Sequence, residues 1–137
     1  MQEERILSSE DDTIIFAKEL APKLRKGDVL ALYGELGAGK TFFTQQLCKF
    51  LGVTENVSSP SYVLMNEYVG TYIIHHLDLY RLDAAEEVLE LGLYDLYENA
   101  ITIIEWPEIA NGMLPKNTIH IYFEFIDQNR KVRISRK

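Results

Sequence analysis

Apolar residues recur along the chain with two periods, a helical one in some segments and a strand-like one in others. In residues 8–24, apolar side chains return every three or four positions, which predicts a helix that Ser8 or Ser9 can cap. Pro22 is expected to disturb the last turn of this helix. Helical periods cover residues 8–24, 41–51 and 84–97, the last interrupted near Gly92. The second of these helices presents Phe43, Leu47 and Phe50 on one face.

Between the helices lie short runs rich in Val, Ile, Leu and Tyr, which are typical of strands. They cover residues 28–33, 62–68, 72–77, 101–104, 118–125 and 131–135. Short links at residues 69–71 and 127–129 predict two β-hairpins. The order of elements is α/β without a strict βαβ alternation, so we expect a mixed, partly antiparallel sheet with a parallel centre.

A glycine-rich segment between the first strand and the second helix matches the complete pattern G-x-x-x-x-G-K-[ST]. It consists of Gly34, Glu35, Leu36, Gly37, Ala38, Gly39, Lys40 and Thr41. The glycines allow backbone N–H groups to surround a phosphate, and the following helix directs its positive end to the same place. Lys40 can reach the β- and γ-phosphates, and the Thr41 hydroxyl can bind Mg²⁺. The segment predicts a site for a nucleoside triphosphate in a P-loop NTPase-type three-layer fold.

Composition limits the remaining possibilities. The 137 residues have room for one domain, residues 1–137, and 47% of them are hydrophobic, an ordinary value for a soluble globular protein. No apolar run is long enough to span a membrane, and residues 1–5 do not resemble a signal peptide, so we expect a cytoplasmic location without membrane contact. The sole cysteine, Cys48, lies in a helical apolar pattern, which predicts a small core residue.

The charge is unevenly distributed. The net charge is −7, which argues against extensive direct binding of nucleic acid. Five of the 14 Lys and Arg residues nevertheless lie in the last eight positions. We expect this basic end to be a solvated edge strand, since lysine and arginine protect sheet edges from pairing.

Two carboxylates follow strand-like runs and are candidates for the chemistry of the site. A phosphate loop needs an acid at the end of a neighbouring strand to hold Mg²⁺, and Glu105 directly follows residues 101–104. Glutamate replaces the commoner aspartate here, so the ligand arm is one methylene longer. Asp78 follows residues 72–77, and local reasoning leaves open whether it binds the metal through water, orients an attacking water or caps a helix.

Other polar and aromatic residues are ambiguous from the sequence alone. Ser59 lies where nucleotide switches place a hydroxyl that senses metal or γ-phosphate, but a polar turn explains it equally well. Trp106 can pack near the nucleotide or belong to the core. His75 and His76 lack neighbours at metal-binding spacing, so we expect ordinary sheet positions for both.

Four segments together resemble one family, the small bacterial TsaE-type ATPases of tRNA threonylcarbamoyladenosine synthesis. They are residues 34–41, Ser-Pro-Ser-Tyr at 59–62, His-Leu-Asp-Leu-Tyr-Arg-Leu at 76–82 and Glu-Trp-Pro-Glu at 105–108. The resemblance implies ATP and Mg²⁺ as cofactors and the TsaD and TsaB proteins as partners. These partners install threonylcarbamoyl on N6 of adenosine 37 of tRNAs, so contact with tRNA would be mostly indirect.

The resemblance also implies roles for individual residues. Lys40 would hold the phosphates, while Thr41 and Glu105 would hold Mg²⁺. Asp78 would be needed for hydrolysis, so that Lys40, Asp78 and Glu105 form the catalytic set. Ser59 and Trp106 would join the loop in nucleotide binding, and residues 59–62 would behave as a switch. Ser61 stands where relatives often have threonine, and it keeps the hydroxyl.

Arginine is scarce near these motifs. None lies in the phosphate loop or near Ser59, so charge that develops on the γ-phosphate is expected to be poorly stabilised and hydrolysis slow. A partner could complete the site or order the Ser59 segment. Strong activation by partners is therefore predicted.

Three other functions are alternatives to this one. A small-molecule kinase usually needs a lid and acceptor-binding arginines, but this chain is short and arginine-poor between the loop and Arg130. A regulatory GTPase would need an N-K-x-D sequence and a D-x-x-G switch, and neither is present. A binding module whose docking is gated by nucleotide, with incidental hydrolysis, remains an alternative.

Overall fold

The structure is a computed structural model that describes residues 2–60 and 63–136. Its strands are β1 (Gln2–Leu7), β2 (Val29–Tyr33), β3 (Met65–Val69), β4 (Ile73–Asp78), β5 (Ile101–Glu105), β6 (Ile119–Ile126) and β7 (Asn129–Arg136). Its α-helices are α1 (Glu10–Leu20), α2 (Lys40–Phe50), α3 (Ala85–Glu90) and α4 (Leu93–Tyr97). Two 3₁₀ helices, η1 (Ala21–Lys23) and η2 (Pro107–Ala110), complete the described elements.

The described strands form one seven-stranded sheet in the order β1-β7-β6-β2-β5-β4-β3. In its middle, the four strands β4, β5, β2 and β6 run parallel to one another. At one side, β3 pairs antiparallel with β4. At the other side β6, β7 and β1 pair antiparallel in succession. The carboxyl ends of the parallel strands therefore meet at one edge, where α/β folds bind their ligands.

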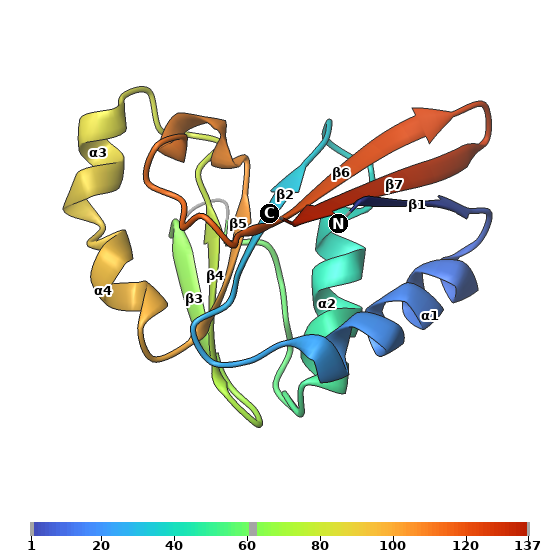
Figure 1. Ribbon diagram of the computed structural model, residues 1–137, viewed down its shortest axis with the longest axis horizontal. Helices are drawn as coiled ribbons and strands as arrows, with labels where there is room; N and C mark the ends of the chain where they lie inside the picture. The colour runs from blue at the N-terminus through green and yellow to red at the C-terminus, as the bar shows by residue number, and fades with distance from the viewer. Residues whose placement is uncertain (1, 61–62, 137) are drawn as a thin grey trace.

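Helices cover the sheet from both sides, which gives the three layers predicted from the sequence (Figure 1). Helices α1 and α2 lie on one face, where Phe16, Phe43 and Phe123 pack against each other in a large apolar core. Helices α3 and α4 lie on the opposite face over a smaller core around Leu77 and Ile104. No helix within residues 2–60 and 63–136 is long and apolar enough to cross a membrane.

Several local predictions are confirmed. Ser9 caps α1 by accepting a hydrogen bond from the backbone N–H of Asp12, and Pro22 falls in the 3₁₀ turn η1 that follows the helix. Gly92, in the left-handed conformation, separates α3 from α4. Cys48 is buried in the core, as its place in the apolar pattern of α2 predicts.

Three predictions about elements are wrong. Strand β1 was not predicted, and because it pairs with β7, the basic C-terminal segment is not an edge strand. Its positive charge is instead partly matched within the fold, since Lys131 pairs with Glu4 and Arg136 with Asp28. Phe50 is 38% exposed and does not share the buried face of α2, because the last turn directs Leu47 and Cys48 to the core and leaves Phe50 at the margin of that face.

The first predicted hairpin is present but shorter. Strand β3 begins at Met65, and Tyr62, from which the strand was predicted, lies outside the described residues. Strands β3 and β4 pair in the antiparallel register that a hairpin requires.

Two glycines are required because backbone passes close to them. Gly34 has φ +145° at the start of the phosphate loop, and a Cβ there would lie 2.8 Å from the carbonyl oxygen of Phe123. Gly70, in the β3–β4 turn, faces the carbonyl oxygen of Leu51, with which a Cβ would collide. The adjacent Thr71 N–H donates to that oxygen at 2.8 Å, so the hairpin turn is fastened to the end of α2.

Candidate functional site

The phosphate loop lies between the end of β2 and the start of α2, in the strand-loop-helix context that its sequence requires. Gly39 precedes the helix with φ +106°, a conformation that favours glycine. Lys40 is the first residue of α2 and its side chain folds back over the loop, where Nζ donates to the carbonyl oxygen of Gly34 at 2.6 Å. The ammonium group is thus held beside the loop backbone.

The surroundings of Lys40 combine burial with negative charge. Its side chain is only 4% exposed, and burial lowers the pKa of the ammonium group below its usual value. Glu105, Asp78 and Glu108 act in the opposite direction, since their negative charge raises that pKa. An anionic ligand would add further compensation for the buried charge.

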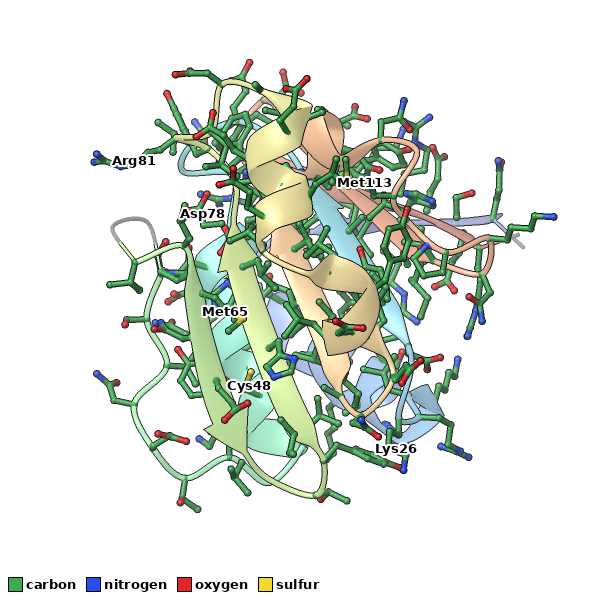
Figure 2. The ribbon with its side chains drawn as sticks, turned by 90° about the vertical axis from the view of Figure 1, so that its left-hand side faces the viewer. Lys26, Cys48, Met65, Asp78, Arg81 and Met113 are labelled. Atoms are coloured by element: carbon green, nitrogen blue, oxygen red, sulfur yellow. The ribbon has the colours of Figure 1, made fainter. Side chains whose placement is uncertain are left out.

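The two candidate carboxylates lie side by side at the ends of adjacent parallel strands. Asp78 of β4 and Glu105 of β5 are register partners, and Glu105 is also the register partner of Leu32 in β2. Both carboxylates are buried. Parallel pairing therefore places Asp78 and Glu105 beside the phosphate loop, which follows β2 directly. Figure 2 shows Asp78 at the end of its strand, near the edge of the sheet.

Within residues 2–60 and 63–136, two neighbours hold the carboxylate of Asp78. Its Oδ1 accepts from the backbone N–H of Tyr80 at 2.9 Å, and its Oδ2 accepts from the hydroxyl of Ser59 at 3.3 Å. No helix follows it directly, because α3 begins only at Ala85, so the helix-cap interpretation is wrong. Ser59 therefore lies at the site, while Ser61 and Tyr62 of the predicted switch fall outside the described residues.

These residues share one cavity of about 330 Å³. Its lining consists of Leu36, Gly37, Gly39, Lys40, Thr41, Phe42, Ser59, Asp78, Glu105, Trp106 and Arg130. The structure thus brings together most of the residues that the sequence singled out, although they come from four separate segments. Gly34, Glu35 and Ala38 belong to the loop but do not line this cavity.

Trp106 covers the loop lysine. It follows β5 in the left-handed conformation, with φ 56°, and its ring lies 3.8 Å from Lys40 Nζ. The ring of Trp106 also packs edge-on against Tyr80, at 4.8 Å between ring centroids. Trp106 is therefore part of the site and not only of the core.

Arg130 reaches the site from β7, two strands away from β2 in the sheet, which the sequence did not predict. It lies on β7, and its guanidinium donates to the carbonyl oxygen of Gly37 in the phosphate loop at 3.3 Å. Its Nε is buried and has no hydrogen-bond partner among residues 2–60 and 63–136. The sequence has no arginine in the loop or near Ser59, but pairing of β7 with β6 brings Arg130 beside the loop in space. No local pattern could have indicated this.

His76 is the second functional candidate that the sequence did not indicate. It is fully buried on β4, and its Nε2 lies 2.6 Å from Oε2 of Glu105. His75, on the opposite face of the same strand, bonds Glu67 of the neighbouring strand and is an ordinary sheet residue, as expected. The spacing of two residues from Asp78 is the signal that could have identified His76, since both side chains then point to the same face.

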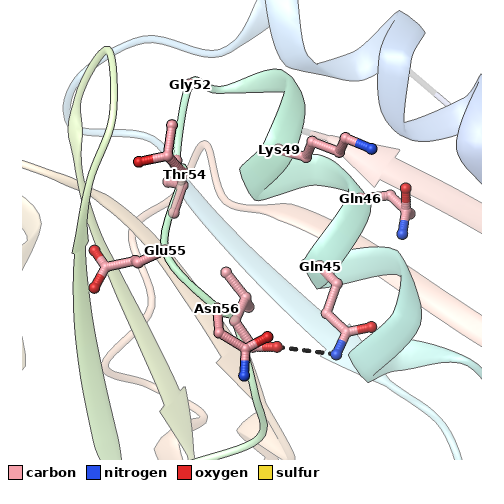
Figure 3. A pocket seen from close by; sticks show the side chains of 9 residues that line it. Gln45, Gln46, Lys49, Gly52, Thr54, Glu55 and Asn56 are labelled. Carbon is pink, nitrogen blue, oxygen red and sulfur yellow. Dashed lines mark hydrogen bonds between the residues drawn. The ribbon is translucent and has the colours of Figure 1, made fainter.

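Of the further hollows that adjoin α2, two lie close to the site or to the segment that leads to it. One of about 310 Å³ shares Gly39, Phe42 and Arg130 with the cavity above and continues toward Ser9 and Thr13. The other, of about 590 Å³, lies toward the opposite end of the helix and is lined mainly by polar side chains (Figure 3). There the side-chain amide of Gln45 donates to the carbonyl oxygen of Val57 at 2.9 Å and ties α2 to the segment that leads to Ser59.

Known proteins are similar to this chain in sequence and in fold. Proteins described as tRNA threonylcarbamoyladenosine biosynthesis protein TsaE from Rickettsia felis and Rickettsia bellii are 39% and 37% identical to this chain. The alignments cover 93% and 96% of the chain and 75% and 93% of these relatives. The crystal structure of YdiB from Bacillus subtilis superposes with a TM-score of 0.81 at 28% identity, over 99% of this chain and 86% of that one.

A family profile agrees with these matches. The profile described as threonylcarbamoyl adenosine biosynthesis protein TsaE matches residues 7–133, which include the phosphate loop, both carboxylates and Arg130. This chain therefore belongs to the TsaE family of tRNA threonylcarbamoyladenosine biosynthesis, and it has a P-loop NTPase-type fold.

Proposed function

We propose that this chain is an ATPase that binds and slowly hydrolyses Mg-ATP and acts with the TsaD–TsaB complex in forming N6-threonylcarbamoyladenosine at position 37 of tRNAs. The observation that carries the proposal is the shared cavity. Lys40 and Thr41 at the start of α2, Asp78 and Glu105 at strand ends, and Ser59 all line it. This combination of cation, hydroxyl groups and carboxylates is what phosphoryl transfer to water requires.

The donor set fits Mg²⁺. Magnesium prefers oxygen ligands and keeps several waters, so it is usually bound through one or two carboxylates together with substrate phosphates. Thr41 and Glu105 offer such oxygens in the cavity, and within residues 2–60 and 63–136 no cluster of three His, Cys, Asp or Glu forms a closed metal cage. Bound Mg²⁺ would neutralise charge on the β- and γ-phosphates.

The remaining steps belong to the protein's own groups. The N–H groups of the loop and the ammonium of Lys40 would bind the phosphates, while Asp78, held by Tyr80 and Ser59, would orient the attacking water. The guanidinium of Arg130 would also approach phosphate oxygens, since it lines the cavity and already contacts Gly37 of the loop. Slow turnover is still expected, because Ser59 is exposed and its bond to Asp78 is long.

A partner protein would accelerate hydrolysis by ordering the segment that carries Ser59. The experiment is steady-state ATP hydrolysis by the chain alone and then with purified TsaD and TsaB from the same organism, with Lys40→Ala as the blank. We expect slow hydrolysis by the chain alone and a clear rise with both partners. No rise, despite complex formation and nucleotide binding, would reject the partner-activated mechanism and favour the nucleotide-gated binding module.

A further inference from the structure

We infer that His76 is a positioning residue of this site, which holds the Glu105 carboxylate in the orientation from which it meets a divalent cation. The inference rests on the proposed function, because it assigns to His76 a role toward the metal of that same site. It is carried by the buried contact between His76 Nε2 and Glu105 Oε2, at 2.6 Å.

The geometry shows which face of β4 carries this contact and which atom donates. Strands β4 and β5 are adjacent and parallel, and Asp78, two residues after His76, is the register partner of Glu105. The side chains of His76 and Asp78 therefore leave β4 on the same face, one behind the other along the strand. A carboxylate oxygen only accepts, so Nε2 donates to Oε2. The second oxygen of Glu105 is then left for the cavity, which Glu105 lines.

A glutamate needs such a contact more than an aspartate does. Its longer side chain has one more rotatable bond, so without a partner it would adopt several orientations at the cavity wall. A buried carboxylate also needs hydrogen-bond donors to remain buried. His76 supplies both the donor and the constraint. The hydrogen bond to His76 thereby restricts the additional rotatable bond of Glu105, as residues behind the ligands of other metal sites fix the orientation of those ligands.

The other ring nitrogen of His76 gives no alternative explanation for its burial. Its Nδ1 is buried and has no hydrogen-bond partner among residues 2–60 and 63–136. Among those residues, the ring of His76 therefore makes its side-chain hydrogen bond to Glu105.

The same strand provides a matched control. His75 Nε2 lies 2.9 Å from Glu67 Oε1, so β4 carries two histidine–glutamate pairs on opposite faces. Glu67 is exposed, however, and neither His75 nor Glu67 lines the cavity that contains Lys40. A substitution of His75 therefore removes a histidine–glutamate contact from the same strand without reaching the proposed metal site.

The experiment measures metal binding separately from hydrolysis. Mn²⁺ replaces Mg²⁺ as a paramagnetic probe, and electron paramagnetic resonance gives its affinity for the protein–ADP complex. The fluorescence of Trp106, the sole tryptophan, gives ADP affinity in the presence of EDTA. The variants are His76→Leu, which removes the donor, His76→Gln, whose amide keeps an N–H near the position of Nε2, and His75→Leu.

We expect His76→Leu to weaken Mn²⁺ binding about 10- to 100-fold. His76→Gln should restore most of the affinity, His75→Leu should bind Mn²⁺ like the wild type, and ADP affinity in EDTA should be the same in all chains. If His76→Leu does not fold, His76→Asn replaces it, since its amide is too short to reach Glu105, and the same weakening is expected.

Wild-type Mn²⁺ affinity in His76→Leu, or an equal loss in His75→Leu, would overturn the inference while leaving the proposed function intact. A wild-type chain that binds no nucleotide in either assay would overturn both. The two failures are therefore distinguishable.

Discussion

The sheet contains two regions that contribute to the site in different ways. The parallel centre, made of β2, β4 and β5, carries the phosphate loop, Asp78 and Glu105 directly at its strand ends. The antiparallel wing, made of β6, β7 and β1, contributes one residue, Arg130, which the pairing of β7 with β6 brings to the loop. A functional residue at the end of a parallel strand can be recognised from a short stretch of sequence. A functional residue on the wing reaches the site only through the pairing of distant strands.

The two regions also differ in burial, since the centre is more deeply buried than the wing. Every residue of β5 is buried, because the helices of both layers cover it. Strand β7 buries only Val132 and Ile134 and leaves Arg133 exposed. The wing thus has one solvated face, and its contribution to the site can be removed with less damage to the core.

The largest effect is expected from a substitution in the parallel centre, Asp78→Asn. In Asp78→Asn the side chain keeps an acceptor for the Tyr80 N–H but loses its charge and its ability to orient the attacking water. We expect ATP hydrolysis to fall about 100-fold or more. Nucleotide should bind at least as tightly, because a negative charge beside the phosphates is removed. Single-turnover hydrolysis and equilibrium binding separate the two quantities.

Asp83→Asn is the matched control, since it removes the same charge at an exposed position five residues further on. Its hydrolysis rate should equal that of the wild type. An unchanged rate in Asp78→Asn would remove Asp78 from the proposed mechanism.

The next effect tests the wing. Arg130→Ala removes a guanidinium that contacts Gly37, and charge-assisted hydrogen bonds contribute about 1.5–3 kcal/mol. We expect ATP affinity to fall about tenfold or more. Arg133→Ala, on the same strand but over the ring of Tyr122, should leave affinity unchanged. Isothermal titration calorimetry with ATP compares the variants, and equal losses in both would mean that only the general charge of the wing matters.

A smaller effect compares packing in the two regions. Ile103→Val in the centre and Ile134→Val in the wing each remove one buried methylene, which costs about 0.5–1.5 kcal/mol. We expect the larger loss of unfolding free energy for Ile103, because its strand is covered on both faces. Urea denaturation of both variants measures the difference. A larger loss for Ile134 would show that the wing is packed as tightly as the centre.

The smallest expected effect is at Cys48. Burial raises the pKa of its thiol to about 12, so the thiolate is almost absent from the folded chain at pH 8 to 9. Thiol reagents in that pH range should leave the native protein unlabelled and label it in urea. Labelling of the folded chain that increases with pH in this range would show that the core around α2 opens readily.

The sequence predicted the centre well because consecutive residues encode it. A strand followed by Gly34 to Thr41 and a helix is a local pattern, and Asp78 and Glu105 were found because the ends of parallel strands meet at one edge. The order and number of strands in the wing were not predictable in this way. Their pairing depends on contacts between residues far apart in the chain.

Strand β1 was missed for a particular physical reason. Alternate positions on its core side hold Glu3 and Arg5 in place of apolar residues, so the period of two is hidden. Arg5 is accommodated by Glu19 and by the ring of Phe16, which lies 5.2 Å from its guanidinium. Arg130 was missed because 93 positions separate it from Gly37.

The fastening of the β3–β4 turn to α2 also restricts how chains of this kind can change in length. One inserted residue would rotate the end of α2 by about 100° and carry the carbonyl of Leu51 away from Gly70 and Thr71. The same insertion would shift the distance between the phosphate loop and the hairpin that leads to Asp78. Insertions and deletions among homologous chains should therefore be rare in α2 and in the β3–β4 turn, and a library of single-residue insertions would test this directly.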